Sequence, residues 1–184
     1  MHSLVFALML LAQDPHAQAA AQVRQMALAR IPLAQKVAAD PELLRAVLAK
    51  NAVPESPAEI QRKDEEWIRN PRDPLRRELT QNACAVRLRK LVGDDAIIVE
   101  AFLMDERGGL VCSTVETSDY WQGDEAKWQR TYEKGEAVFV DEPALDASTH
   151  TFAVQLSVLV SDQGHRNGAL TFTLKVPREM AGGK

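Results

Sequence analysis

The sequence has few of the residues from which catalytic and metal sites are usually built. Its 184 residues include two cysteines and four histidines. Neither kind shows a C-x-x-C or H-x-x-x-H spacing, so neither a redox motif nor a zinc site is indicated. A G-x-S-x-G nucleophile turn, a glycine-rich phosphate loop and a cysteine–histidine pair with an orienting residue are also missing. We therefore expect a non-enzymatic protein with no catalytic residues, no metal and no cofactor.

An excess of positive charge is missing too. The chain has 22 Lys and Arg against 26 Asp and Glu, for a net charge of -4, and its 46% hydrophobic content is that of a soluble globular protein. The basic cluster of Arg72, Arg76 and Arg77 lies beside Asp73 and Glu78, a pattern typical of a solvated helix face. Nucleic acid is therefore not an expected partner.

The apolar run LVFALMLLA at residues 4–12 is too short for a bilayer, which takes about 20 residues. Small residues follow at 17–21, and together they match the apolar region and A-x-A cleavage site of a secretory signal peptide. No Lys or Arg precedes the run, and a buried N-terminal helix is the alternative. We predict a signal peptide over residues 1–21, cleaved after Ala19 or Ala21, and a periplasmic location.

The two cysteines, Cys84 and Cys112, are consistent with export. In an oxidising compartment a lone pair of cysteines tends to form a disulfide. A bridge that closes a loop of this size would stabilise the fold by roughly 3 kcal/mol. Two buried free thiols are the alternative.

The hydrophobic period changes near residue 95. Before that point, Asp40-Pro41-Glu42 and Ser56-Pro57-Ala58-Glu59 each combine a capping side chain, a proline suited to the first helical turn and an acidic residue that complements the helix dipole. We predict a helical segment over residues 22–74 and a longer helix from about 75 to 91.

Beyond residue 95, apolar and polar residues alternate as in half-buried strands. Turn residues at 105–109 and 161–164 indicate two hairpins. The strands are expected at 97–104, 110–114, 137–140, 151–160 and 169–176. The predicted fold class is α+β, a helical N-terminal half followed by a five-stranded antiparallel sheet packed by a long helix.

An aromatic-rich segment lies between the second and third expected strands. If residues 121–133 are helical, Trp121, Glu125, Trp128 and Tyr132 fall on one face. Aromatic walls with a few oriented polar groups suit a small-molecule pocket. The alternative is that these rings pack a helix onto the sheet.

The same segment resembles PDC/Cache sensor domains, the extracytoplasmic PAS-like family, and in particular its stand-alone periplasmic members. The resemblance covers about residues 75–177, and we assign 75–178 to the domain and 179–184 to a tail. It rests on a D-x-x-G hairpin turn and on the motifs TSDYWQGDEAKW (117–128), DAST (146–149), QLSVLVSDQG (155–164) and NGALTFTL (167–174). It implies a PAS-like five-stranded sheet and a pocket between the sheet and its connecting helix and loops.

The resemblance also implies which side chains line the pocket. The candidates are Tyr120, Trp121, Asp124, Trp128, Asp146, Ser148 and Gln155. Each has a structural alternative: Asp124 suits a helix cap, Asp146 and Ser148 suit a turn, and Gln155 suits a solvent-facing strand position.

The resemblance implies a function as well. It is that of a periplasmic small-molecule binding or sensing protein that acts through a separate signalling partner, such as a membrane receptor. Its ligand would be an amine, an amino acid or a carboxylate. Asp119, Asp124 and Asp146 near aromatic rings favour an amine or amino acid, through carboxylate pairing and cation–π contact. A ligand-free protein-interaction or scaffold module with the same fold is the alternative.

Overall fold

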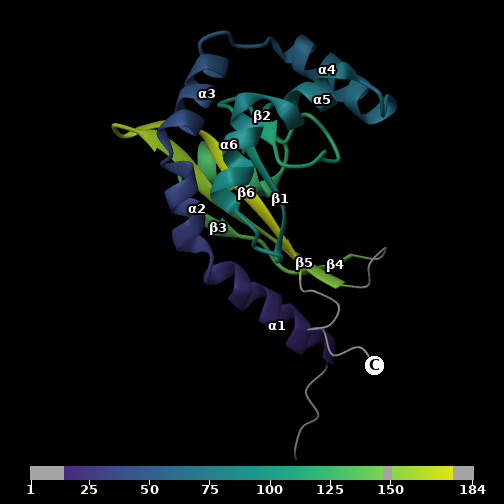
Figure 1. Ribbon diagram of the computed structural model, residues 1–184, viewed down its shortest axis with the longest axis vertical. Coiled ribbons are helices and arrows are strands. Elements are labelled where there is room, and N and C mark those ends of the chain that lie inside the picture. The colour runs from purple at the N-terminus through teal and green to yellow at the C-terminus, as the bar shows by residue number, and fades with distance from the viewer. Residues whose placement is uncertain (1–14, 147–150, 176–184) are drawn as a thin grey trace, which may run out of the picture.

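Helices occupy the first half of the chain and strands the second, as the change of period predicted (Figure 1). The computed structural model describes residues 15–146 and 151–175. The helices of the first half are α1 (Pro15–Leu28), α2 (Ile31–Ala38), α3 (Pro41–Asn51), α4 (Pro57–Arg69), α5 (Pro74–Gln81) and α6 (Ala83–Val92).

The strands form one antiparallel sheet with the order β2-β1-β6-β5-β3, and β4 also pairs with β5. The five expected strands are present, and β4 is an addition to them. The α+β fold class is therefore confirmed. The strands are β1 (Ile98–Met104), β2 (Leu110–Ser113), β3 (Val138–Val140), β4 (Ala144–Asp146), β5 (Thr151–Asp162) and β6 (His165–Lys175).

Two helices begin at the residues that the sequence indicated. Asp40 caps α3, where its Oδ1 accepts the backbone N–H groups of Glu42 and Leu43 at 3.0 and 3.2 Å. Ser56 and Glu59 form a reciprocal capping box at the start of α4. These side chains satisfy N–H groups that a helix cannot pair within itself, which is why local sequence was enough to place both starts.

The single helix expected over residues 75–91 is instead two helices, separated at Asn82. Asn82 has an extended backbone, with φ -64° and ψ 170°, and its side chain caps α6 by accepting the N–H of Ala85 at 2.8 Å. Its amide also donates to the carbonyl of Val111 in β2, at 3.1 Å. The break lays α6 against β2, where Cys84 forms the predicted disulfide with Cys112.

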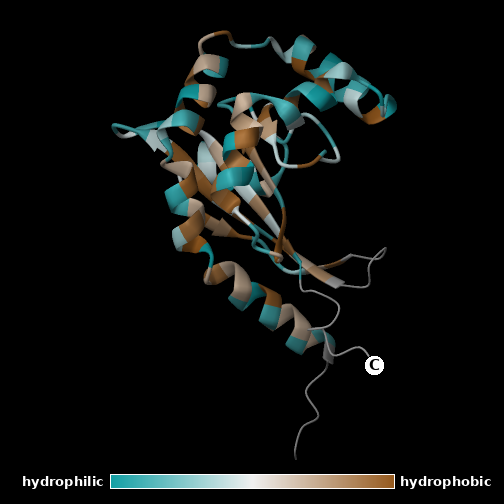
Figure 2. Ribbon diagram, viewed as in Figure 1, coloured by the Kyte–Doolittle hydropathy of each residue, from teal (hydrophilic) through white to brown (hydrophobic). Residues whose placement is uncertain are grey.

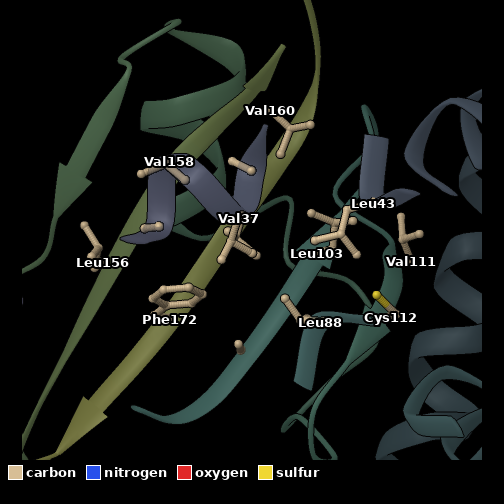
Figure 3. Close-up of a cluster of buried hydrophobic side chains, with 14 of the residues drawn as sticks. Val37, Leu43, Leu88, Leu103, Val111, Cys112, Leu156, Val158, Val160 and Phe172 are labelled. Atoms are coloured by element: carbon tan, nitrogen blue, oxygen red, sulfur yellow. The ribbon is translucent and has the colours of Figure 1, made fainter. Parts of the chain in front are cut away.

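The larger core lies between one face of the sheet and helices α1, α2, α3 and α6. Val37 lies over the alternating residues of the last two strands, while Leu43 and Leu88 lie beside Leu103 of β1, and all four are fully buried (Figure 3). Apolar burial of this kind is the main force that holds the layers together. The core-facing residues of β5 and β6 are Val154, Leu156, Val158, Val160, Leu170, Phe172 and Leu174.

A second, smaller core attaches α4 and α5, which lie beyond the β2 edge of the sheet and consist largely of hydrophilic residues (Figures 1 and 2). Trp67 of α4 and Tyr120, which follows β2, are both fully buried in it, together with Leu110. The Trp67 and Tyr120 ring centroids are 6.3 Å apart. This core positions α4 against the aromatic-rich segment.

The apolar run expected in a signal peptide, residues 4–12, lies outside the described residues. α1 passes through Ala19 and Ala21, the two expected cleavage positions, so cleavage there would shorten this helix. Within residues 15–146 and 151–175, no helix has both the length and the apolar character needed to cross a bilayer.

Candidate functional site

A cleft of about 630 Å³ separates α4 from the segment that follows β2. Its volume is within the range typical of small-molecule sites, about 300–1,000 Å³. Two of the predicted site residues, Trp121 and Asp124, line it. The other lining residues come from the start and inner face of α4 and from the β1–β2 turn: Pro57, Ile60, Gln61, Asp64, Glu65 and Arg107.

The aromatic segment reaches the cleft as a non-helical strand-like stretch. Trp121 forms an isolated antiparallel bridge with Gly109, and the N–H of Gln122 donates to the carbonyl of Gly108 at 2.8 Å. The helix expected over residues 121–133 begins only at α7 (Ala126–Trp128), which continues into a π-helical turn, η1 (Gln129–Glu133). The expected four-residue face therefore does not form.

Two glycines allow the Trp121 indole to lie flat against the β1–β2 turn. A Cβ atom on Gly123 would come within 2.6 Å of the indole Nε1, and one on Gly108, whose φ is +80°, within 2.5 Å of the Gly123 Cα. The indole N–H donates to the carbonyl of Arg107 at 2.7 Å. Because the ring is held in this way, the half-buried indole forms a fixed wall of the cleft.

Asp64 of α4 holds the segment from the other side. Its Oδ1 accepts the backbone N–H groups of Tyr120 and Trp121, both at 2.9 Å. The indole of Trp67, one helical turn further on, donates to the carbonyl of Thr117 at 3.1 Å. Sequence reasoning missed Asp64, although it lies on the same face of α4 as Ile60 and Trp67, at helical spacings of four and three.

The charge of the cleft is mainly negative. Among its described lining residues are three carboxylates, Asp64, Glu65 and Asp124, and one guanidinium, Arg107. Arg107 is oriented by a hydrogen bond from its Nη1 to the carbonyl of Glu55, at 2.7 Å. Such a site favours a ligand with an ammonium group, and the guanidinium provides a place for a carboxylate on the same ligand.

Two further predicted residues are in the smaller core and not in the cleft. The hydroxyl of Tyr120 donates to Glu55 Oε2 at 2.7 Å and accepts from Lys50 Nζ at 3.0 Å. Trp128 is buried, its indole donates to the carbonyl of Asp105 at 3.0 Å, and its ring stacks on Tyr132 with centroids 5.0 Å apart. Trp128 therefore packs in the smaller core.

The remaining candidates come from the last two strands and the loop before them. Gln155 is half-buried on β5, opposite Thr173 of β6, and does not line the cleft. Asp146 ends β4. Ser148 lies outside the described residues. The structure thus brings Trp121 and Asp124 together and places Gln155 on a different surface.

That surface, the second face of the sheet, carries a polar group of its own beneath α7. Glu100 accepts a hydrogen bond from the hydroxyl of Thr173 at 2.7 Å, and burial raises its pKa above the ordinary value. Lys127 is almost fully buried, with its Nζ 5.4 Å from the Phe102 ring centroid and paired with Glu125. Within residues 15–146 and 151–175, no group of His, Cys, Asp or Glu has an arrangement that could hold a metal ion.

Comparison with known proteins gives results only at the level of structure. No family model matches the chain, and no curated protein matches it. The ligand-binding domain of the Pseudomonas aeruginosa PAO1 amino-acid chemoreceptor PctC, in complex with GABA, is 15% identical with a TM-score of 0.46, over 86% of this chain and 57% of that one. The neighbours are sensor domains of the PDC/Cache type.

Two further solved structures show the same similarity. The ligand-binding domain of the Pseudomonas fluorescens chemoreceptor CtaA, in complex with L-alanine, is 13% identical with a TM-score of 0.43, over 86% of this chain and 55% of that one. The sensor domain of the Vibrio cholerae histidine kinase DctB is 12% identical with a TM-score of 0.42, over 86% and 54%. The chain spans a little over half the length of these domains. The sequence motifs resemble the same family.

Proposed function

We propose that this protein is a non-enzymatic sensing module that binds a small amine or amino acid in the cleft between α4 and residues 121–124. One observation carries the proposal. A fixed indole wall, three carboxylates and one guanidinium converge on a cleft of small-molecule size. The ammonium group of the ligand would lie against Trp121 and pair with Asp124, and a carboxylate, where the ligand has one, would pair with Arg107.

Binding in this cleft would act on α4. The helix touches the aromatic segment through Asp64 and Trp67, and a ligand between them would favour one spacing of the two elements over others. A ligand shifts such an equilibrium by its difference in affinity for the two states. In our proposal the protein is exported to the periplasm by residues 1–21 and presents this change to a separate signalling partner, such as a membrane receptor.

The test is a thermal-shift and calorimetric screen of the purified chain against GABA, L-alanine, butylamine and butanoate. A ligand at 100 times its dissociation constant stabilises the folded chain by about 2.7 kcal/mol. We expect an amine or amino acid to bind and Asp124→Asn to weaken that binding by at least about tenfold, since it removes a charge-assisted contact. Asp94→Asn, which removes an exposed carboxylate outside the cleft, is the matched control.

The same screen separates this proposal from the scaffold alternative. The burial of Tyr120 and Trp128 is compatible with a module that has kept the fold without a ligand. Absence of binding of GABA, L-alanine and butylamine, or binding of an amine with equal affinity by Asp124→Asn, would contradict the proposal and favour a scaffold.

A further inference from the structure

A second cavity, of about 320 Å³, lies on the other side of the smaller core. It is lined by the end of α3, by α4, α5 and the start of α6, and by β2. Among the described residues it has no lining residue in common with the cleft. Its floor is apolar, formed by Leu75, Leu79, Leu110 and Val111. We call it the lysine cavity, because Lys50 and Lys63 also line it.

The two lysines share one anion. Both Nζ atoms pair with the same oxygen, Oε1 of Glu55, while Oε2 of Glu55 accepts from the hydroxyl of Tyr120. Burial opposes the ionisation of Glu55, but hydrogen bonds from Lys50, Lys63 and Tyr120 outweigh it and lower its pKa to about 2. Glu55 is therefore anionic at neutral pH. Lys50, Lys63 and Glu55 together carry a charge of +1.

The ammonium groups retain unused donors. Each has three N–H groups. Lys50 uses one on Glu55 and one on Tyr120, and Lys63 uses one on Glu55. One N–H of Lys50 and two of Lys63 thus have no acceptor within the part of the chain that the structure describes. Both side chains are partly buried, with 23% and 27% of their surface exposed, and both line the cavity, so a ligand there can reach the ammonium groups.

We propose that the lysine cavity binds a short aliphatic carboxylate. The carboxylate group accepts hydrogen bonds from Lys50 and Lys63, and the alkyl chain covers the apolar floor at Leu75, Leu79 and Leu110. A carboxylate supplies both the oxygens and the negative charge that the ammonium pair lacks, whereas an alcohol supplies no charge and an amine would be repelled.

Glu78 provides an internal check on this assignment. It also lines the cavity, and its side chain is exposed, so its carboxylate opposes an anionic ligand from the solvent side. The repulsion is weakened by water but not abolished. Removing the charge of Glu78 should therefore tighten the binding of a carboxylate, which would not follow if the ligand were held by apolar contacts alone.

The test is calorimetric titration of the full chain with butanoate, butan-1-ol and butylammonium, which share an alkyl chain and differ in charge. We expect only butanoate to bind in the lysine cavity. Lys63→Met keeps the apolar stem and leaves Glu55 paired with Lys50. It should weaken butanoate binding by at least about tenfold. Glu78→Gln should strengthen it.

The outcomes also separate this site from the cleft. Asp124→Asn should leave butanoate binding unchanged, and Lys63→Met should leave amine binding unchanged. Equal binding of butanol, unchanged butanoate affinity in Lys63→Met, or no gain in Glu78→Gln would overturn the assignment. If Lys63→Met does not fold, as judged by circular dichroism, the result for Glu78→Gln decides.

Discussion

At the scale of single residues, Asp119 is the most perturbed carboxylate of the aromatic segment. Its pKa is raised to about 6, mainly by burial. The neighbouring charge of Glu125 also raises the pKa, by more than Lys127 lowers it. The side-chain amide of Gln122 donates to one of its oxygens. Above pH 6 the folded chain must therefore hold this carboxylate in an unfavourable ionised form.

The pH dependence of stability follows from the direction of this shift. An ordinary Asp pKa is 3.8, so between pH 6 and 3.8 the folded chain binds more protons at Asp119 than the unfolded chain does. Its contribution to stability therefore increases as pH falls through this window. We predict that Asp119→Asn, which is neutral at every pH, raises the melting temperature at pH 7.5 and loses this advantage near pH 4. Thermal unfolding at both values is the measurement, with Asp94→Asn as the background, and an equal shift at both values would contradict the argument.

Single residues also show what the sequence could reveal about the site. Trp121 and Asp124 were found because an aromatic and an acid in a connecting segment suit a pocket. Asp64 and Arg107 were missed because their place in the cleft depends on a contact between segments more than fifty residues apart, Asp64 with Tyr120. Residue type alone also does not show that Tyr120 faces away from the cleft while its neighbour Trp121 lines it.

At the scale of elements, local signals gave correct predictions and long-range contacts overrode them elsewhere. The caps of α3 and α4 and the alternation of β5 and β6 use residues a few positions apart. The break at Asn82 needs the carbonyl of Val111, and the extended conformation of Trp121 needs Gly109. A helical pattern in the sequence does not contain these partners, so two of the expected helices were too long.

The close approach of β6 to β1 at Gly168 leads to a prediction about stability. A Cβ atom on Gly168 in β6 would lie 2.1 Å from the carbonyl oxygen of Met104 in β1, so the two central strands can pair this closely only with glycine there. We predict that Gly168→Ala destabilises the fold by about 2 to 3 kcal/mol, the cost of forced overpacking. Urea unfolding measures it.

Gly164→Ala is the matched control for this substitution. Gly164 lies in the β5–β6 turn with φ +83°, but a Cβ atom there would meet nothing within 4 Å, so only the backbone conformation penalises alanine, by about 1 kcal/mol. If Gly168→Ala cost no more than Gly164→Ala, the close approach of β6 to β1 would not be a constraint on the sheet.

At the scale of the whole molecule, α4 contributes to two compartments with different sets of charged groups. The cleft on one side is mainly acidic, and the lysine cavity on the other has two ammonium groups. Glu55 touches both, because its carboxylate pairs with Lys50 and Lys63 while its carbonyl accepts from Arg107 of the cleft. The position of Glu55 is therefore set by contacts with both compartments, its carboxylate facing the lysines and its carbonyl facing Arg107.

The disulfide acts at the same scale, because it joins the helical half of the chain to the sheet. Cys84 in α6 and Cys112 in β2 are 28 positions apart. Closing a loop of that length removes conformational freedom from the unfolded chain, worth about 3 to 4 kcal/mol. For a chain of this size that amounts to a fall in melting temperature of about 10 °C when the bridge is reduced.

Thermal unfolding with and without dithiothreitol measures this contribution, and the double variant Cys84→Ser, Cys112→Ser is the control. The melting temperature of the wild-type chain should fall in reductant. The melting temperature of the variant should be low with and without reductant. An equal response of the two proteins would show that the reductant acts elsewhere. Because Cys84 also lines the lysine cavity, carboxylate binding should weaken together with the loss of the bridge, and amine binding in the cleft should change less.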